Sequence, residues 1–254
     1  MKPVCLIVGA GAGIGGHTGK KFAAEGYYPC LCRRSDASGL EKIVEEIKHS
    51  GFEAKGFLLD ATKDTTIEKT ISDVEEEIGP IEVAVYNLGA QIGDRSLAET
   101  SLKQFELGWR LGTFGLFRLA SFLFPKMVER GKGTLIVTSS TAAVRGNEGQ
   151  HSHAAAMGGR RMLCQSLNAE FSSKGIHIAH VIIDGAVDAP DTLGKMLGAQ
   201  KFQELRESVG LGKDGLLLPD KIADTYYHVA QQHRSAWAHE IDLRSFSDKP
   251  WWNR

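Results

Sequence analysis

Short apolar runs that alternate with amphipathic stretches along the whole chain constrain its fold more than any other feature. The apolar runs have the length of buried strands, and they cover residues 4–8, 29–32, 54–59, 81–86, 134–138, 176–183 and 240–243. The stretches with helical spacing cover residues 14–25, 40–48, 65–78, 102–128, 153–171 and 219–230, of which residues 102–128 form one long or broken helix. Such alternation predicts a parallel sheet that helices cover on both faces.

The pattern continues without a linker or low-complexity tract, so we expect one Rossmann-type domain over residues 1–254. With 42% hydrophobic residues, a chain of this length can bury a single large core. The exception is residues 188–218, which are rich in glycine and charge and have no clear period. We expect this segment to be a partly helical lid or substrate loop.

Composition excludes several classes of protein. A net charge of -1 argues against a nucleic-acid-binding protein, because neutralising phosphates requires a basic face. The first apolar run is too short for a signal peptide, and no stretch is expected to approach the apolar length of a membrane span. Cys5, Cys30, Cys32 and Cys164 lack metal-binding spacing. We therefore expect a cytoplasmic protein with buried thiols and no metal site.

A glycine-rich loop directly follows the first predicted strand and precedes the first predicted helix. It contains Gly9, Gly11, Gly13, Ile14 and Gly15. Glycines permit a tight turn and let the backbone approach a pyrophosphate, which the N–H groups of the helix N-terminus then bind. The loop therefore predicts a dinucleotide site. The alternative is a glycine-rich turn that binds no ligand.

The spacing Gly-x-x-x-Gly-x-Gly resembles the short-chain dehydrogenase/reductase family. Four further segments fit that family in order: Asp60-Ala61, Asn87-Leu88-Gly89-Ala90, Thr138-Ser139-Ser140, and Gly185 with Pro190. The resemblance implies a doubly wound Rossmann fold with a single parallel sheet of about seven strands and a homodimer or homotetramer. It also implies hydride transfer between a nicotinamide cofactor and a small carbonyl or alcohol substrate. The implied cofactor contacts are Gly9, Gly11, Gly13, Ile14, Gly15, Asp60, Ala61, Asn87, Gly89 and Gly185.

The end of the second predicted strand indicates which nicotinamide cofactor is bound. NAD-dependent relatives carry a carboxylate there, whereas this chain has Arg33 and Arg34 and no acid before Asp36. Guanidinium groups suit a 2′-phosphate, so we expect NADP(H) rather than NAD(H). The alternative is a pair of arginines on a solvated turn.

The resemblance also implies a catalytic tyrosine, lysine, serine and asparagine, of which only Ser140 is present. Gly112 stands in the asparagine position, and Met157 stands in the lysine position. His153, 13 residues after Ser140, stands in the tyrosine position, and no Tyr-x-x-x-Lys occurs anywhere in the chain. We therefore take Ser140 and His153 as the candidate catalytic residues.

An imidazole exchanges protons near neutral pH without a lysine beside it. Because Met157 removes a cation, we expect the imidazolium form of His153 to be easier to reach and to protonate a carbonyl. The shorter reach of imidazole weakens the match with a phenol. His153 as a plain helix-start residue, and His151 or Arg145 as the acid, remain alternatives.

Three functions fit these observations: an NADP(H)-dependent oxidoreductase with an altered acid/base group, a cofactor-binding protein without turnover, and a non-redox isomerase or cyclase. We favour the first, because the cofactor-binding residues are intact. A Ser140, His153 and Asp184 triad is less favoured, because its serine lacks flanking glycines. Arg160 and Arg161 are expected in solvent or at a subunit contact. Trp251 and Trp252 are expected to anchor onto the domain or onto a neighbouring subunit.

Overall fold

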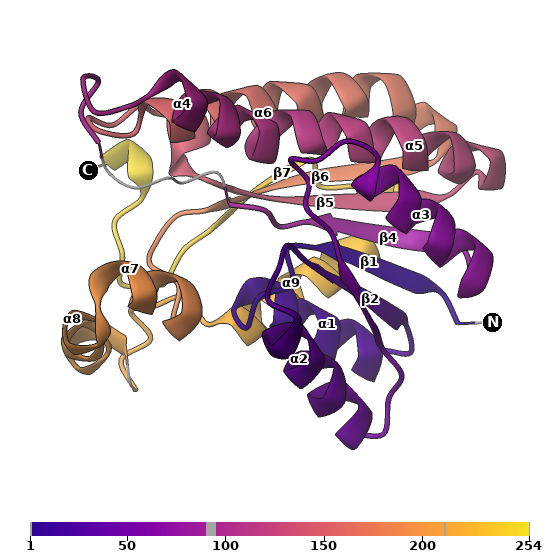
Figure 1. The fold of residues 1–254 in the computed structure, drawn as a ribbon, viewed down its shortest axis with the longest axis horizontal. Helices are drawn as coiled ribbons and strands as arrows, with labels where there is room; N and C mark the ends of the chain where they lie inside the picture. Colours follow the sequence, from indigo (N-terminus) through magenta and orange to yellow (C-terminus); the bar gives the residue numbers. More distant parts are fainter. Residues whose placement is uncertain (1, 90–94, 211, 254) are drawn as a thin grey trace.

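The computed structural model describes residues 2–89, 95–210 and 212–253, and its centre is one parallel sheet of seven strands. The strand order is β3-β2-β1-β4-β5-β6-β7 (Figure 1). The strands are Val4–Val8 (β1), Tyr28–Arg33 (β2), Lys55–Leu58 (β3), Ile81–Tyr86 (β4), Gly133–Ser140 (β5), Ile176–Ile183 (β6) and Glu240–Leu243 (β7). This arrangement confirms the predicted doubly wound Rossmann fold, and every strand end lies within two residues of its expected position.

Helices cover both faces of the sheet, as predicted (Figure 1). One face carries α1 (Ile14–Ala24), α2 (Ala37–His49) and α9 (Pro219–Ala230), and the other carries α3 (Thr66–Glu77), α4 (Leu102–Trp109), α5 (Gly115–Arg130) and α6 (His151–Phe171). Each layer encloses its own apolar core against the sheet. Strands that are buried on both sides explain why their sequences read as continuous apolar runs.

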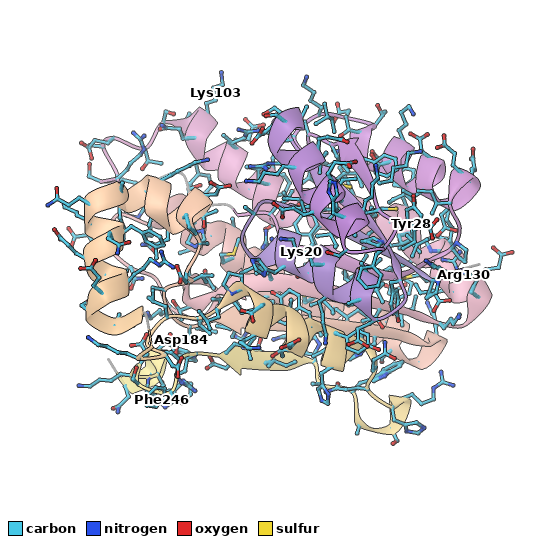
Figure 2. The ribbon with its side chains drawn as sticks, turned by 90° about the horizontal axis from the view of Figure 1, so that it is seen from below. Lys20, Tyr28, Lys103, Arg130, Asp184 and Phe246 are labelled. Carbon is cyan, nitrogen blue, oxygen red and sulfur yellow. The ribbon has the colours of Figure 1, made fainter. Side chains whose placement is uncertain are left out.

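After β3 the chain crosses to the other half of the sheet, so the strand order reverses between β1 and β4. These neighbouring strands are followed by loops that leave in opposite directions, which opens a crevice at their carboxyl ends. Figure 2 shows Asp184, which follows β6, at one end of the molecule and Arg130, which precedes β5, at the opposite end. The glycine loop after β1 and the segment after β4 therefore both open at the carboxyl end of the sheet.

The predicted helix over residues 102–128 is broken by a π-helical turn at Arg110–Phe114, between α4 and α5. The whole path Leu102–Arg130 is long and apolar enough to cross a membrane, by length and composition alone. This corrects the expectation that no stretch approaches such a length. The path packs on the sheet as a core helix, with Leu116, Leu119 and Leu123 in the apolar cluster beneath it. The apolar residues on its sheet-facing side therefore belong to the protein interior, while Phe117 and Phe122 on the other side are exposed.

The irregular segment over residues 188–218 contains helical turns, as expected. They are a π-helical turn at Pro190–Gly194, α7 (Lys195–Leu197), α8 (Ala199–Leu205) and a second π-helical turn at Arg206–Gly210. An ion pair of 3.1 Å between Arg206 and Asp188 ties the second turn to the start of the segment.

The four cysteines are free and buried, as predicted. Burial raises the pKa of the Cys30 thiol to about 12, and it also raises the pKa of Cys5, Cys32 and Cys164. These thiols are therefore protonated packing groups at neutral pH.

A buried ion pair fixes the loop after β3 against the helices above it. The Arg118 guanidinium on α5 donates to both carboxylate oxygens of Glu68 on α3, at 2.8 and 2.6 Å. It also donates to the carbonyls of Ala61 and Lys63, at 3.2 and 2.9 Å. Arg118 therefore holds the Asp60-Ala61 segment at the edge of the crevice.

Replacing Glu68 by glutamine should lower the free energy of unfolding by about 3 kcal/mol, because it leaves a buried guanidinium without a counter-charge. Asp73→Asn removes the exposed ion pair with Lys69 on the same helix and should cost at most about 0.5 kcal/mol. Urea unfolding of both variants measures the difference. Equal losses would contradict the structural role assigned to Arg118.

Candidate active site

A cavity of about 310 Å³ opens at the carboxyl end of the sheet. The predicted residues that line it are Gly9, Gly11, Gly13, Ile14, Gly15, Asn87, Gly89, Ser140 and His153. The predicted residues that do not line it are Arg33, Arg34, Asp60, Ala61 and Gly185. Lining residues that were not predicted as site residues are Leu88, Thr138, Ser139, Met157, Arg160, Val187, Ala189 and Thr192. One cavity therefore joins the glycine loop to the candidate catalytic pair.

The glycine loop has the tight geometry that its sequence indicates. Gly9 has a φ of +103°, and a Cβ there would lie 2.7 Å from the Asn87 carbonyl oxygen. A Cβ on Gly15 would overlap the Gly9 carbonyl. Gly13 is the N-cap of α1, and no side chain caps the N–H groups of the first turn. The uncapped N-terminus borders the cavity, so these residues fit a pyrophosphate group.

Asn87 joins the two halves of the sheet at this point. Its Nδ2 donates to the Gly9 carbonyl at 2.9 Å, and its backbone N–H donates to the Val8 carbonyl at 2.8 Å. The side chain therefore stabilises the glycine loop as well as lining the cavity. Ala90, the last residue of that motif, lies outside the described residues.

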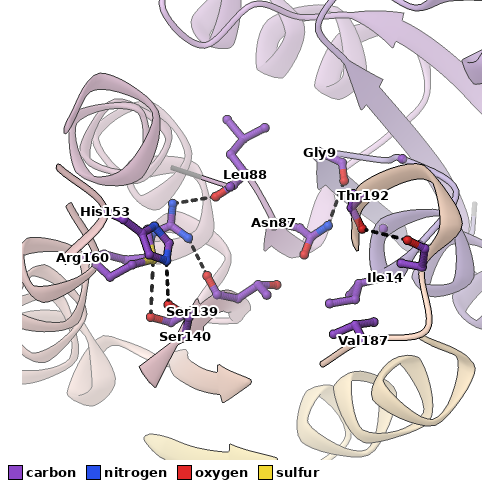
Figure 3. A pocket seen from close by; sticks show the side chains of 17 residues that line it. Gly9, Ile14, Asn87, Leu88, Ser139, Ser140, His153, Arg160, Val187 and Thr192 are labelled. Carbon is purple, nitrogen blue, oxygen red and sulfur yellow. Dashed lines mark hydrogen bonds between the residues drawn. The ribbon is translucent and has the colours of Figure 1, made fainter. Parts of the chain in front are cut away.

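Ser140 and His153 meet on the opposite wall (Figure 3). Ser140 is the last residue of β5, and His153 lies in the first turn of α6. The Ser140 Oγ and the His153 Nε2 are 3.0 Å apart, which is a hydrogen bond. Within the described residues, the His153 Nδ1 has no hydrogen-bond partner. The two predicted residues therefore form a pair without a third polar group behind the imidazole.

The protonation of His153 differs from the expectation. Burial, and after it the nearby Arg160 guanidinium, lowers its pKa to about 4. His153 is therefore neutral near pH 7, and the expected ease of forming imidazolium is wrong. Met157 stands where the family resemblance implies a lysine. The cation near His153 is instead Arg160, which was expected in solvent or at a subunit contact.

The expectation that Arg160 lies in solvent or at a subunit contact is wrong, because the residue is only 1% exposed. Its guanidinium lines the cavity and donates to backbone carbonyls, among them those of Gly112 and Leu88 at 2.7 and 2.8 Å. Its neighbour Arg161 points the other way and pairs with Glu240 at 2.7 Å. The missed signal was present in the sequence. Residues 153, 157 and 160 have the spacing that places side chains on one helix face.

The two deeply buried tyrosines do not replace the absent catalytic tyrosine. The Tyr86 hydroxyl donates to the Leu111 carbonyl at 2.6 Å, and the Tyr226 hydroxyl shares a hydrogen bond of 2.7 Å with the Thr138 Oγ1. Burial raises the pKa of both phenols. Their oxygens are therefore engaged in packing contacts away from the Ser140–His153 pair.

The residues expected near an adenosine lie beyond the cavity. Arg33 forms an ion pair of 2.9 Å with Asp36, while the Arg34 side chain is exposed. The Asp60 carboxylate accepts from the backbone N–H and the hydroxyl of Thr62, at 3.0 and 2.7 Å. These contacts leave Arg34 as the cation most open to a ligand at this corner.

Three of the outer residues have structural contacts. Ala61 is buried, and its carbonyl accepts from Arg118. Gly185 follows β6, where a Cβ would lie 3.2 Å from Leu217. Asp184 accepts from the Trp251 backbone N–H at 2.9 Å. That contact confirms Trp251 as an anchor, and no hydrogen bond joins Asp184 to the imidazole in the described part of the chain, which argues against the triad. No group of three or more potential metal ligands occurs among the described residues.

Comparisons with known proteins agree with this geometry. The family model for short chain dehydrogenase matches residues 3–195. The short-chain reductase protein NovJ of Streptomyces niveus is 30% identical over 91% of this chain and 88% of its own length. A short-chain dehydrogenase from Rhodopseudomonas palustris has a TM-score of 0.79 at 28% identity, covering 96% of this chain and 99% of that one. The alcohol dehydrogenase of the archaeon Thermococcus sibiricus, solved with 5-hydroxy-NADP, has a TM-score of 0.82 at 25% identity and covers 98% of each chain.

The buried imidazoles predict a loss of stability in acid. Burial lowers the pKa of His153 and of His180 to about 4, from an ordinary value of 6.5. Between these values the unfolded chain binds protons that the folded protein does not, so the free energy of unfolding should fall as pH decreases from 6.5 to 4. Urea unfolding across this range measures the slope. His153→Gln should flatten it, whereas the exposed His49→Gln should leave it unchanged.

Proposed function

Because the chain belongs to the short-chain dehydrogenase family, we propose that it is an NADP(H)-dependent oxidoreductase acting on a small carbonyl or alcohol substrate. The observation that carries this proposal is the single cavity that joins the α1 N-terminus to the Ser140–His153 pair. A bound dinucleotide and its substrate would span this cavity, with a phosphate at one wall and the reacting oxygen at the other. When bound, nicotinamide would supply or accept the hydride.

Cofactor binding is assigned to backbone and side-chain groups around this cavity. The N–H groups at the start of α1 would hold the pyrophosphate, with Gly9 and Gly15 leaving room for it. Asp60 would contact the adenine, as the family resemblance implies. That a relative was solved with 5-hydroxy-NADP supports a nicotinamide dinucleotide as the cofactor class.

The choice of NADP(H) over NAD(H) rests on charge at the end of β2. Arg33 is partly neutralised by Asp36, so Arg34 would supply most of the attraction for a 2′-phosphate. Lys195 on α7 adds a third cation near this corner, since its charge contributes to lowering the pKa of Asp36 after the hydrogen bonds from Gly39 and Ser38. Arg33 and Lys195 act on the Asp36 carboxylate and Arg34 acts on the Asp60 carboxylate, and this gathering of cations favours an anionic ligand group.

Arg34→Glu should weaken NADPH binding by about 10-fold or more and leave NADH binding nearly unchanged, because only NADPH carries the 2′-phosphate. Calorimetric titration of both cofactors measures this difference. Lys132→Glu makes the same charge change just before β5, at the opposite end of the sheet, and should have no such effect. Equal or tighter binding of NADH by the unmodified protein would overturn the NADP(H) assignment.

We assign the proton transfer to Ser140 and His153. A neutral imidazole is a proton acceptor, so the resting pair is set to take the proton of an alcohol as its hydride leaves. The Ser140 hydroxyl would bind the substrate oxygen and pass the proton to the His153 Nε2, which is 3.0 Å away. In the reverse direction, the same imidazole returns the proton to the forming alcohol oxygen.

His153→Ala should reduce turnover at least about 100-fold while leaving NADPH affinity unchanged, because it removes only the proton acceptor. The assay follows nicotinamide absorbance with a panel of secondary alcohols and ketones. His151→Ala, two residues earlier on α6, should retain activity. Loss of activity in His151→Ala but not in His153→Ala would assign the acid/base role to His151. Full activity in both variants would show that neither histidine has this role.

A cofactor-binding protein without turnover is the second candidate. The observation that favours it is Met157, whose thioether sulfur is 3.8 Å from the Ser139 hydroxyl and offers no cation to a nicotinamide ribose. NADPH binding without absorbance change on any substrate would favour this reading. Substrate conversion without absorbance change would favour an isomerase or cyclase.

The proposal extends to the domain organisation, the location and the assembly of the protein. We propose one domain over residues 1–254 in which residues 188–218 close over the substrate, in a cytoplasmic protein. We also propose a homodimer or homotetramer, because α4 and α5 expose several large aromatic side chains: Phe105, Trp109, Phe117 and Phe122. Light scattering of the purified protein would measure the assembly.

A further inference from the structure

Arg160 stands at the junction of three elements that form the inner wall of the cavity. Its Nη2 donates to the carbonyl of Leu88, just after β4, and its Nη1 donates to the carbonyl of Thr138, near the end of β5. Its Nε donates to the carbonyl of Gly112 within the π-helical turn. One side chain of α6 thus connects the loop after β4, the strand β5 and the α4–α5 break.

The π-helical turn explains why these acceptors exist. A wide turn shifts the helical hydrogen-bond pattern and turns carbonyls toward the interior. The Leu111 and Gly112 carbonyls accept from Tyr86 and Arg160, respectively. Close approach is possible because Gly115 has no Cβ, which would overlap the Tyr86 hydroxyl. The sequence around Gly112 is therefore shaped to receive a buried donor.

The charge of Arg160 has no carboxylate partner in the described part of the chain. Its guanidinium lies 5.2 Å from the centre of the Tyr86 ring, and the titratable groups that act on it are Tyr86, Cys164 and Tyr226. Burial raises the pKa of all three, so none of them supplies a negative charge near pH 7. Among the described residues, backbone carbonyl dipoles balance this positive charge, and the guanidinium forms part of the cavity wall.

We propose that Arg160 is a positioning residue of this active site, which fixes the wall behind Ser140 and His153 and supplies the positive charge that Met157 cannot. This inference rests on the proposed function of the same cavity. It assigns to one side chain the positive charge that the family resemblance places on a lysine at the position of Met157.

Other charged groups near His153 do not take this role. Arg160 is the charged group that acts on its imidazole within the described residues. Other titratable or charged side chains of the neighbouring elements include His151 and Arg161 on α6, His180 on β6, Arg145 after β5, Lys103 and Glu106 on α4, and Arg110 in the π-helical turn. The Arg145 Nη1 bonds the Trp251 carbonyl, and Glu106 pairs with Arg110 at 2.8 Å. Lys103 is exposed.

The test separates the charge of Arg160 from its planar hydrogen-bonding group. Arg160→Lys keeps the charge and loses the fork, while Arg160→Gln loses the charge and keeps amide donors. NMR titration of the His153 imidazole in the full chain without ligand reports the effect. The midpoint should rise by about one pH unit in Arg160→Gln and stay close to the unmodified value in Arg160→Lys. Arg161→Gln, one residue away, should leave it unchanged.

Equal midpoints in Arg160→Gln and the unmodified protein would overturn the proposal, as would equal rises in both Arg160 variants, which indicate packing alone. If Arg160→Gln does not fold, Arg160→Met serves as the second neutral variant. If neither neutral variant folds, Arg160→Lys decides: a raised midpoint overturns the proposal, whereas a folded lysine variant with an unchanged midpoint supports it, because the position then requires a cation. The measurement needs no cofactor, so a failure of NADPH binding is detected separately.

Discussion

The hydrogen bond from Asn87 to the Gly9 carbonyl lies at the point on which the rest of the site depends. β1 and β4 are neighbours in the sheet, but their chains leave in opposite directions. Without a cross-link, the two loops could separate and the α1 N-terminus would lose its fixed direction. The short amide side chain holds them together, while the absence of a Cβ at Gly9 lets the backbones meet. A parallel sheet thus becomes a phosphate-binding edge.

The inner face of α6 carries a buried cation although the position assigned to lysine holds Met157. His153, Met157 and Arg160 share this face, and the cation stands one turn beyond the position that the family resemblance assigns to lysine. Burial of an arginine is tolerable only because backbone carbonyls accept its N–H groups. The geometry of the neighbouring helix and the identity of the buried cation therefore depend on each other.

The sheet, both helical layers and the glycine loop could be predicted from the sequence. Strands buried on two faces appear as continuous apolar runs, and the helices between them appear as apolar residues at helical spacing. The sequence was also sufficient to bring Ser140 and His153 together, since a strand end and the following helix start meet at the carboxyl edge. The spacing of residues 153, 157 and 160 indicates that Arg160 shares a helix face with His153, but its burial also requires the carbonyl acceptor at Gly112 in the π-helical turn, which no local pattern indicates. Val187, Ala189 and Thr192 were missed because their segment has no period.

The contact between Ala189 and the glycine loop has a thermodynamic consequence. A Cβ on Gly13 would lie 3.1 Å from the Ala189 Cβ, so the irregular segment lies directly against the N-terminus of α1. A ligand that displaces either the irregular segment or the N-terminus of α1 therefore also affects the other element. Linkage then makes the effect mutual: whatever a dinucleotide does to the affinity for a second molecule under residues 188–218, that molecule does equally to the affinity for the dinucleotide.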